Sequence, residues 1–149
     1  MREIIYCMQF KGTATPGGES GVMKATTSAT SCSVKTVVGP DGVTGTFIPA
    51  EGGLAYFESV VRMTGADTFL EDGTISFGEG DHSLKFSTVG QGYLGPQEGS
   101  SSMAGAVSWK VEGGEGQFKG ATGFITSNFS VDATGQVVDH HFGVIYVKG

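Results

Sequence analysis

Near the C-terminus, Asp139-His140-His141 is the densest cluster of titratable side chains in the sequence. Successive residues of a β-strand point to opposite faces, so His140 and His141 cannot both face one interior. Because histidine titrates near neutral pH, either ring is a candidate general acid or base. The structural alternative is one exposed histidine and one packed, hydrogen-bonded histidine. The third histidine, His82, is distant, and no recognised metal-ligand spacing is present.

A second candidate group, Tyr56, Glu58 and Arg62, shares one face of the strand expected over residues 54–63. If this face lines an interior, Glu58 is a buried carboxylate suited to proton transfer or to stabilising a developing cation. If the face is outside, Glu58 and Arg62 are ordinary surface or interface charges. The opposite face is more apolar and competes for the interior, so both placements stay open at this point. That face carries Phe57, Val61 and Met63.

Three further side chains complete the candidate site. Asn128 could donate a hydrogen bond to a ligand oxygen, although a sheet-edge asparagine near a turn is the simpler interpretation. Trp109 and Tyr93 are candidate walls of an apolar cavity, and ordinary core packing is the alternative for both. The sequence indicates no metal and no cofactor. Serine hydrolase chemistry is not indicated either, because no Gly-x-Ser-x-Gly elbow occurs.

The elements that must position these residues are strands, because apolar residues alternate with period two and no long segment keeps a 3.6 period. About eight strands are expected, joined by short turns at Gly39–Gly42, Glu71–Gly73, Glu79–Asp81 and Asp132–Gly135, with a polar loop at 95–102. This spacing predicts an all-β fold with one domain over residues 1–149, arranged as an eight-stranded antiparallel up-and-down β-barrel. The expected strands cover residues 4–10, 22–38, 54–63, 74–77, 82–93, 103–111, 124–131 and 137–147.

A glycine-rich run at 113–123, Gly-Gly-Glu-Gly-Gln-Phe-Lys-Gly-Ala-Thr-Gly, separates two of these strands. A nucleotide-binding loop would need a helix after it, whereas the β pattern continues from Phe124, so the run predicts a strand-to-strand bend. The run resembles the Gly-Gly-Thr-Gly-x-Phe-x-Gly-Ala-x-Gly signature of the allene oxide cyclase/dirigent superfamily, with Glu115 where threonine is usual. By motif, the resemblance covers about a quarter of the chain.

That resemblance implies a calycin-type, eight-stranded antiparallel barrel, usually dimeric or trimeric. It also implies a lumen that holds a hydrophobic small molecule and steers its cyclisation or coupling. No catalytic residue can be carried over, because the motif offers no second anchor from which to count positions. The fold and the lumen are therefore expectations from the resemblance, while the candidate residues rest on the strand pattern alone.

Composition restricts the partners. The net charge is −6 and the pI is near 4.9, which disfavours nucleic acids and anionic membranes. No apolar stretch is long enough to span a bilayer, and no signal peptide is evident, so a cytoplasmic location with reduced Cys7 and Cys32 is expected. Several strands are apolar on both faces, which predicts a covering subunit in a homodimer or homotrimer.

The expected function is binding of a largely apolar small molecule, with cyclase, isomerase or lyase activity that needs no cofactor. Glu58 with His140 or His141 is the expected acid–base pair, and Tyr56 and Asn128 are expected to orient the ligand. One alternative is a non-catalytic carrier of an apolar ligand. Another is a structural oligomer whose interior is filled by side chains.

Overall fold

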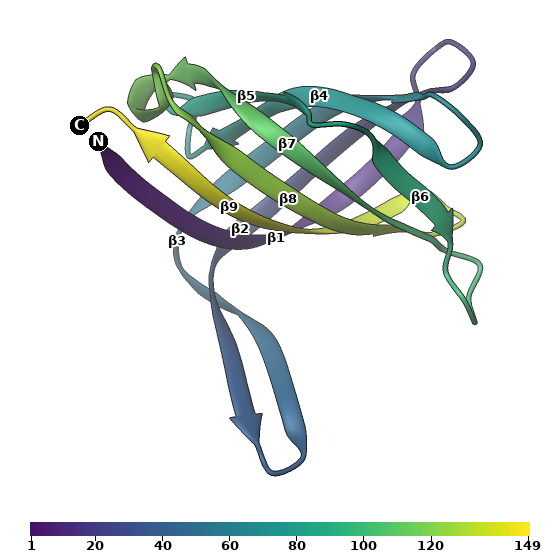
Figure 1. Ribbon diagram of the computed structural model, residues 1–149, viewed down its shortest axis with the longest axis horizontal. Helices are drawn as coiled ribbons and strands as arrows, with labels where there is room; N and C mark the ends of the chain where they lie inside the picture. The colour runs from purple at the N-terminus through teal and green to yellow at the C-terminus, as the bar shows by residue number, and fades with distance from the viewer.

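The computed structural model describes residues 1–149 and consists almost entirely of antiparallel β-strands (Figure 1). The only helical element is η1, a single 3₁₀ turn at Gly116–Phe118. The all-β class expected from the alternation is therefore confirmed. The strands are β1 (Arg2–Pro16), β2 (Val22–Gly39), β3 (Gly42–Met63), β4 (Thr68–Phe77), β5 (Ser83–Thr88), β6 (Gly92–Pro96), β7 (Met103–Glu115), β8 (Thr122–Val131) and β9 (Gln136–Val147).

The sheet closes on itself into a ring. Its order is β3-β2-β1-β9-β8-β7-β5-β4-β6, and an additional β3–β4 pairing joins the two sides. Strands β5 and β6 both lie between β4 and β7, so together they fill one place in the ring. The sheet has nine strands where about eight were expected, because the segment predicted as one strand at 82–93 breaks near Gly90, whose φ is +70°.

Alternate residues of each strand point into the ring and form its core. At the centre, the Phe57 and Phe86 rings stack with centroids 5.5 Å apart, and Trp109 lies 4.3 Å from Phe86. Isoleucines from β8 and β9, Ile125 and Ile145, are completely buried. Aromatic pairs of this geometry add to the free energy of burial, so the middle of the ring is a packed core.

The glycine-rich run closes one end of the ring. It leaves β7, forms η1 and enters β8, which confirms the strand-to-strand bend. Phe118 of η1 is buried, with its ring centroid 5.3 Å from that of Phe77. Gly123 has a φ of +133°, and a Cβ there would collide with the carbonyl oxygen of Val144 on β9. The N- and C-termini lie near this end in Figure 1.

Two loop assignments made from sequence are wrong. Residues 71–73 are not a turn but the middle of β4, where Gly73 pairs with Ser59 of β3. Gly73 is required there because a Cβ would collide with the carbonyl oxygen of Glu58, so glycine permits a close approach of two strands. The polar loop expected at 95–102 begins only after Pro96, the last residue of β6.

Strands β2 and β3 continue beyond the ring as a projecting hairpin, the arm, which comprises residues 31–53 (Figure 1). The arm begins at a β-bulge between Thr30 and Cys32, where the Ser31 hydroxyl donates to the Gly53 carbonyl at 2.7 Å. Its tip is the predicted turn at 39–42, in which Gly42 adopts a φ of +108°.

Replacing Gly123 by alanine should destabilise the protein by about 2 kcal/mol or more, because the added Cβ is strained at positive φ and collides with β9. The matched control is Gly39→Ala, since a Cβ at Gly39 meets nothing within 4 Å. Urea unfolding of both variants checks this. A Gly123→Ala variant as stable as Gly39→Ala would contradict the close approach described for β8 and β9.

Candidate functional site

An apolar cavity of about 170 Å³ lies inside the ring, toward the end opposite the glycine-rich run. Methionines from three strands, Met23, Met63 and Met103, line it. Methionine is flexible and adapts to irregular apolar shapes. Most of the other lining side chains are also apolar, but two carboxylates, Glu71 and Asp139, reach the cavity. The cavity therefore combines an apolar surface with two acidic groups.

Glu71 is buried on β4 and held by hydroxyl groups of the neighbouring strands. The Ser59 hydroxyl on β3 donates to Glu71 Oε2 at 2.5 Å. Thr88 on β5 fixes the backbone, because its hydroxyl donates to the Glu71 carbonyl at 2.6 Å and its Oγ1 accepts from the Glu71 N–H at 2.7 Å. One carboxylate oxygen is thus engaged by Ser59, and the backbone position is set from the other side.

Burial, together with a smaller contribution from the charge of nearby Asp139, raises the pKa of Glu71 to about 8. The hydrogen bond from Ser59 lowers the pKa and offsets part of this rise. The Trp109 indole also lowers it by facing the carboxyl group, although its N–H makes no hydrogen bond of acceptable geometry. At neutral pH, Glu71 is therefore mainly a neutral carboxylic acid that can donate a proton.

Asp139 and His141 form a buried pair on the inner face of β9. Asp139 Oδ2 lies 2.9 Å from His141 Nε2, and Asp139 Oδ1 accepts from the Ser127 hydroxyl at 2.6 Å. The His141 ring is enclosed by aromatic groups, with centroids 4.3 Å from Phe10 and 5.1 Å from Trp109. This packing fixes the ring, and the serine fixes the carboxylate that faces it.

Four buried polar atoms on the inner side of the ring have no hydrogen-bond partner in the protein. They are Tyr6 Oη, Thr27 Oγ1, Trp109 Nε1 and His141 Nδ1. Such groups are rare in folded proteins, and each costs about 1–3 kcal/mol when nothing bonds to it. Thr27 lines the cavity directly. These atoms are hydrogen-bonding capacity that the protein itself leaves unused.

Tyr6, one of these four residues, lies toward the end of the ring that the glycine-rich run closes. Its ring lies over Gly143 of β9, where a Cβ would collide with it, and burial together with the charge of Asp139 raises its pKa. The hydroxyl therefore stays protonated and serves only as a neutral hydrogen-bonding group. No cluster of three or more histidine, cysteine, aspartate or glutamate side chains is arranged to hold a metal ion.

Of the eight residues expected at the site, the structure places two inside the ring, His141 and Trp109. The alternation on β3 puts Tyr56, Glu58 and Arg62 on the exposed outer face, and Arg62 lies 3.7 Å from Glu19 in a surface ion pair. This resolves the alternative posed by the sequence in favour of surface charges. These three side chains cannot reach the cavity.

The remaining expected residues also lie outside. His140 lies on the outer face of β9, and its Nε2 is 2.9 Å from the side-chain nitrogen of Gln9 on β1. Asn128, the register partner of His140 on β8, is exposed. Tyr93 on β6 is largely exposed. The structure thus separates His140 from His141, as strand geometry requires, and leaves only His141 near a carboxylate of the interior.

Sequence reasoning missed Glu71, Ser59 and Ser127. Glu71 was assigned to a turn because Asp72-Gly73 follows it. The signal that identifies it is the alternation of Phe69, Glu71, Gly73 and Ile75, in which an acidic residue occupies an inward position between apolar ones. Asp139 was noticed only as the neighbour of His141 on the same face.

No family model, curated protein or solved structure matches this chain. The resemblance to the allene oxide cyclase/dirigent superfamily therefore stays a prediction that rests on the glycine-rich run. The structure has no helix with the length and hydropathy needed to cross a lipid bilayer.

The buried acid predicts a pH-dependent stability. Because the pKa of Glu71 rises from 4.5 to about 8 on folding, the native state keeps a proton that the unfolded chain loses. Stability should therefore fall as pH rises between about 4.5 and 8, by up to about 1.4 kcal/mol per pH unit from this group. Urea unfolding at several pH values measures the slope.

The isosteric variant Glu71→Gln should lose this part of the slope, because its amide does not ionise. Glu58→Gln, on the exposed outer face, is the matched control and should keep the slope of the unmodified protein. Equal slopes for all three proteins would show that Glu71 ionises normally and is not the buried acid described here.

Proposed function

We propose that the protein binds a small, largely apolar molecule inside the ring and catalyses a proton-transfer reaction on it, such as isomerisation, cyclisation or elimination. In this proposal the ring is an eight-stranded barrel in which β5 and β6 count as one interrupted strand. The protein acts without a cofactor and in the cytoplasm, where the free Cys7 and Cys32 stay reduced. Its proposed acid and base, Glu71 and Asp139, are not residues that the sequence reasoning selected, whereas His141 and Trp109 are.

The observation that carries the proposal is the meeting of Glu71 and Asp139 in an apolar cavity. Buried carboxylates destabilise a fold unless they are paired, and clusters with perturbed pKa values occur preferentially at functional sites. Here Glu71 is a neutral acid and Asp139 is a carboxylate bound to histidine, and the two lie near one another. Acid–base catalysis needs one group that donates a proton and another that accepts one.

The proposed reaction assigns one role to each group. Glu71, neutral at pH 7, donates its proton to an oxygen of the ligand. Asp139, oriented by Ser127 and His141, accepts a proton from a neighbouring carbon atom. The C–H electron pair then forms the C=C bond of an enol, while the carbonyl π pair becomes the bond to the proton from Glu71. When the ligand is a β,γ-unsaturated ketone, the enol is a conjugated dienol; Asp139 returns its proton to the γ-carbon and the O–H proton goes back to Glu71, which completes an isomerisation and restores both groups. Thr27 and Trp109 supply further hydrogen bonds to ligand oxygens.

The cavity volume limits the part of the ligand that fits. A cavity of about 150 Å³ accommodates a benzene-sized molecule, and this one measures about 170 Å³. A larger ligand would extend past the methionines toward the end of the ring. The second candidate function is a carrier, which the predominance of apolar lining side chains favours. A carrier would bind the same ligands without moving a proton.

A small apolar ketone distinguishes the two functions. With cyclohexanone in deuterated water, the protein should accelerate exchange of the hydrogens next to the carbonyl group, as measured by NMR. The rate should fall above about pH 8, because Glu71 loses the proton it donates. Glu71→Gln and Asp139→Asn should each reduce the exchange rate at least about tenfold, a loss typical of general acid or base removal.

Glu58→Gln serves as the surface control and should exchange at the rate of the unmodified protein. Binding of cyclohexanone, detected by shifts of methionine methyl signals at the cavity, without faster exchange would support the carrier. Neither binding nor exchange would overturn the proposed ligand site.

A further inference from the structure

The arm presents one exposed apolar face. On β2 the side chains of Val34, Thr36 and Val38 share this face, and their register partners on β3, Phe47, Gly45 and Val43, lie on the same side. We refer to these six residues as the arm face. Val38 is 80% exposed and Val43 is 67% exposed. A two-stranded ribbon is at best marginally stable in water unless its apolar face is covered.

A second exposed apolar surface lies on the outside of the ring, across β1, β9 and β8. Ile5, Val144 and Phe124 form one register row, and Cys7 and Phe142 belong to the next. These five residues are the outer patch. Ile5 is 61% exposed and Phe124 is 60% exposed. Contiguous apolar surfaces of this kind mark interaction sites.

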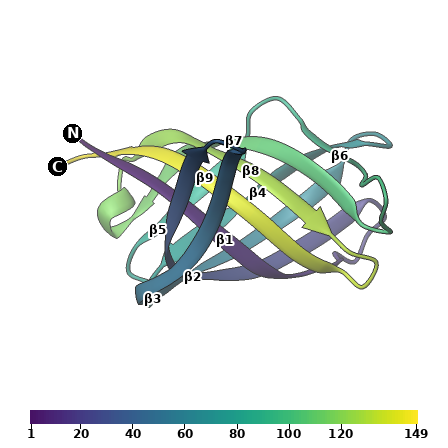
Figure 2. The ribbon, with the colours of Figure 1, turned by 90° about the horizontal axis from the view of Figure 1, so that it is seen from below.

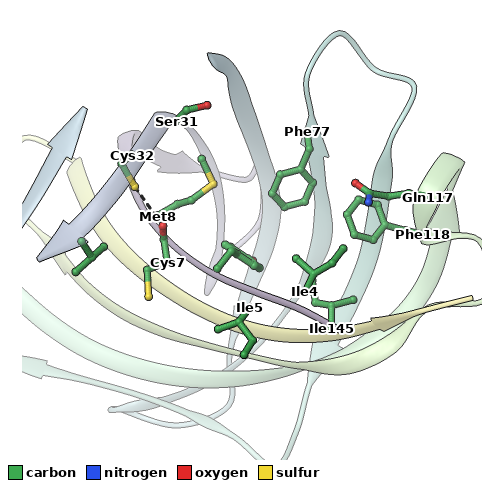
Figure 3. A pocket seen from close by; sticks show the side chains of 12 residues that line it. Ile4, Ile5, Cys7, Met8, Ser31, Cys32, Phe77, Gln117, Phe118 and Ile145 are labelled. Carbon is green, nitrogen blue, oxygen red and sulfur yellow. Dashed lines mark hydrogen bonds between the residues drawn. The ribbon is translucent and has the colours of Figure 1, made fainter. Parts of the chain in front are cut away.

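The two surfaces meet at a corner of the molecule. The base of the arm contacts the outer side of β1 and β9, where Cys32 Sγ donates to the Cys7 carbonyl at 3.2 Å and the Phe47 ring lies 5.1 Å from His140, and the rest of the arm projects away from the ring (Figures 1 and 2). A groove of about 500 Å³ lies at this corner, along the unpaired edge of β1, and Ile5, Cys7 and the arm residue Val34 belong to its lining. Inward-facing side chains of the ring, among them Ile4, Phe77 and Phe118, line the rest of it (Figure 3). Apolar side chains thus form two adjoining walls.

The backbone beside the groove is also open. Strand β1 pairs with β2 only from Lys11 onward, so its first nine strand residues pair on one side with β9 and on the other with nothing. The arm causes this, because β2 leaves the ring at the bulge instead of following β1. An unpaired strand edge that adjoins an apolar groove is a surface that proteins normally cover.

We propose that two copies of this chain associate about a two-fold axis, with the arm face of each packed on the outer patch of the other. An L-shaped surface made of a projecting arm and an adjoining patch is self-complementary, as a two-fold interface requires. No other partner needs to be supplied, because one chain carries both halves of the interface. The six residues of the arm face and the five of the outer patch give eleven contact residues in each chain, most of them apolar, which would form the core of an interface of roughly 20–30 residues a side.

Charge favours this pairing as well. The arm contains three charged residues, Lys35, Asp41 and Glu51, and none of them belongs to the arm face. The outer patch contains no charged residue either, so two copies can pack these surfaces together without burying a charge. The proposal concerns the outer surface and stands independently of the function proposed for the interior.

Native mass spectrometry and sedimentation equilibrium test the proposal on the full chain. The unmodified protein should be a dimer at micromolar concentration. Val38→Asp combined with Val43→Asp should weaken association at least about a hundredfold, because charges would have to be desolvated on the arm face. Val37→Asp is the matched control, since Val37 is 43% exposed on the opposite face of the arm and should leave the dimer intact.

A mixing experiment tests which surfaces meet. Phe124→Asp alters the outer patch and should also give monomers. Mixed with the arm double variant, it should form a heterodimer, because the intact arm of one chain meets the intact patch of the other. Arm-to-arm contact predicts no such rescue and would overturn the proposal. So would a monomeric or three-copy unmodified protein, or dissociation by Val37→Asp to the same extent.

Discussion

Closure of the sheet is the constraint on which the rest of the structure depends. Because the β3–β4 pairing completes the ring, alternate residues of its strands share one enclosed interior with little access to water. Polar side chains there can be satisfied only by neighbours across the strands. Ser59 serves Glu71 in this way, and Ser127 serves Asp139. The same enclosure that makes a neutral Glu71 more stable than its anion brings the two carboxyl groups near each other.

The two ends of the ring differ, and this difference determines where the proposed ligand would bind. Phe118 and Phe77 fill the end near the glycine-rich run with aromatic rings. Flexible methionines line the cavity toward the other end. The proposed ligand would therefore approach the carboxyl groups through an apolar region that excludes water, and low polarity strengthens every hydrogen bond made inside. On the outside, departure of the arm leaves part of β1 unpaired, so closure is incomplete where a second chain could bind.

The strand pattern was readable from the sequence, whereas the inward direction of each strand was only partly so. Period-two alternation identified most strands, and the glycine-rich run was correctly interpreted as a bend because a strand pattern follows it. On β3, both faces carry residues suited to an interior. Packing against the other strands determines that the face with Phe57 points inward and the face with Glu58 points outward. Glu71 was overlooked because Asp72-Gly73 resembles a turn. The glycine is there because β3 approaches closely, a contact between segments that local sequence does not encode.

The interior of the ring holds a carboxylic acid, Glu71, that is neutral at physiological pH, next to the Asp139 carboxylate fixed by serine and histidine. NMR titration of the side-chain carboxyl carbons, with Glu71 assigned by comparison with Glu71→Gln, measures this most directly. The structure predicts that the Glu71 signal titrates with a pKa of about 8. Titration near 4.5, the ordinary value for glutamate, would contradict the account.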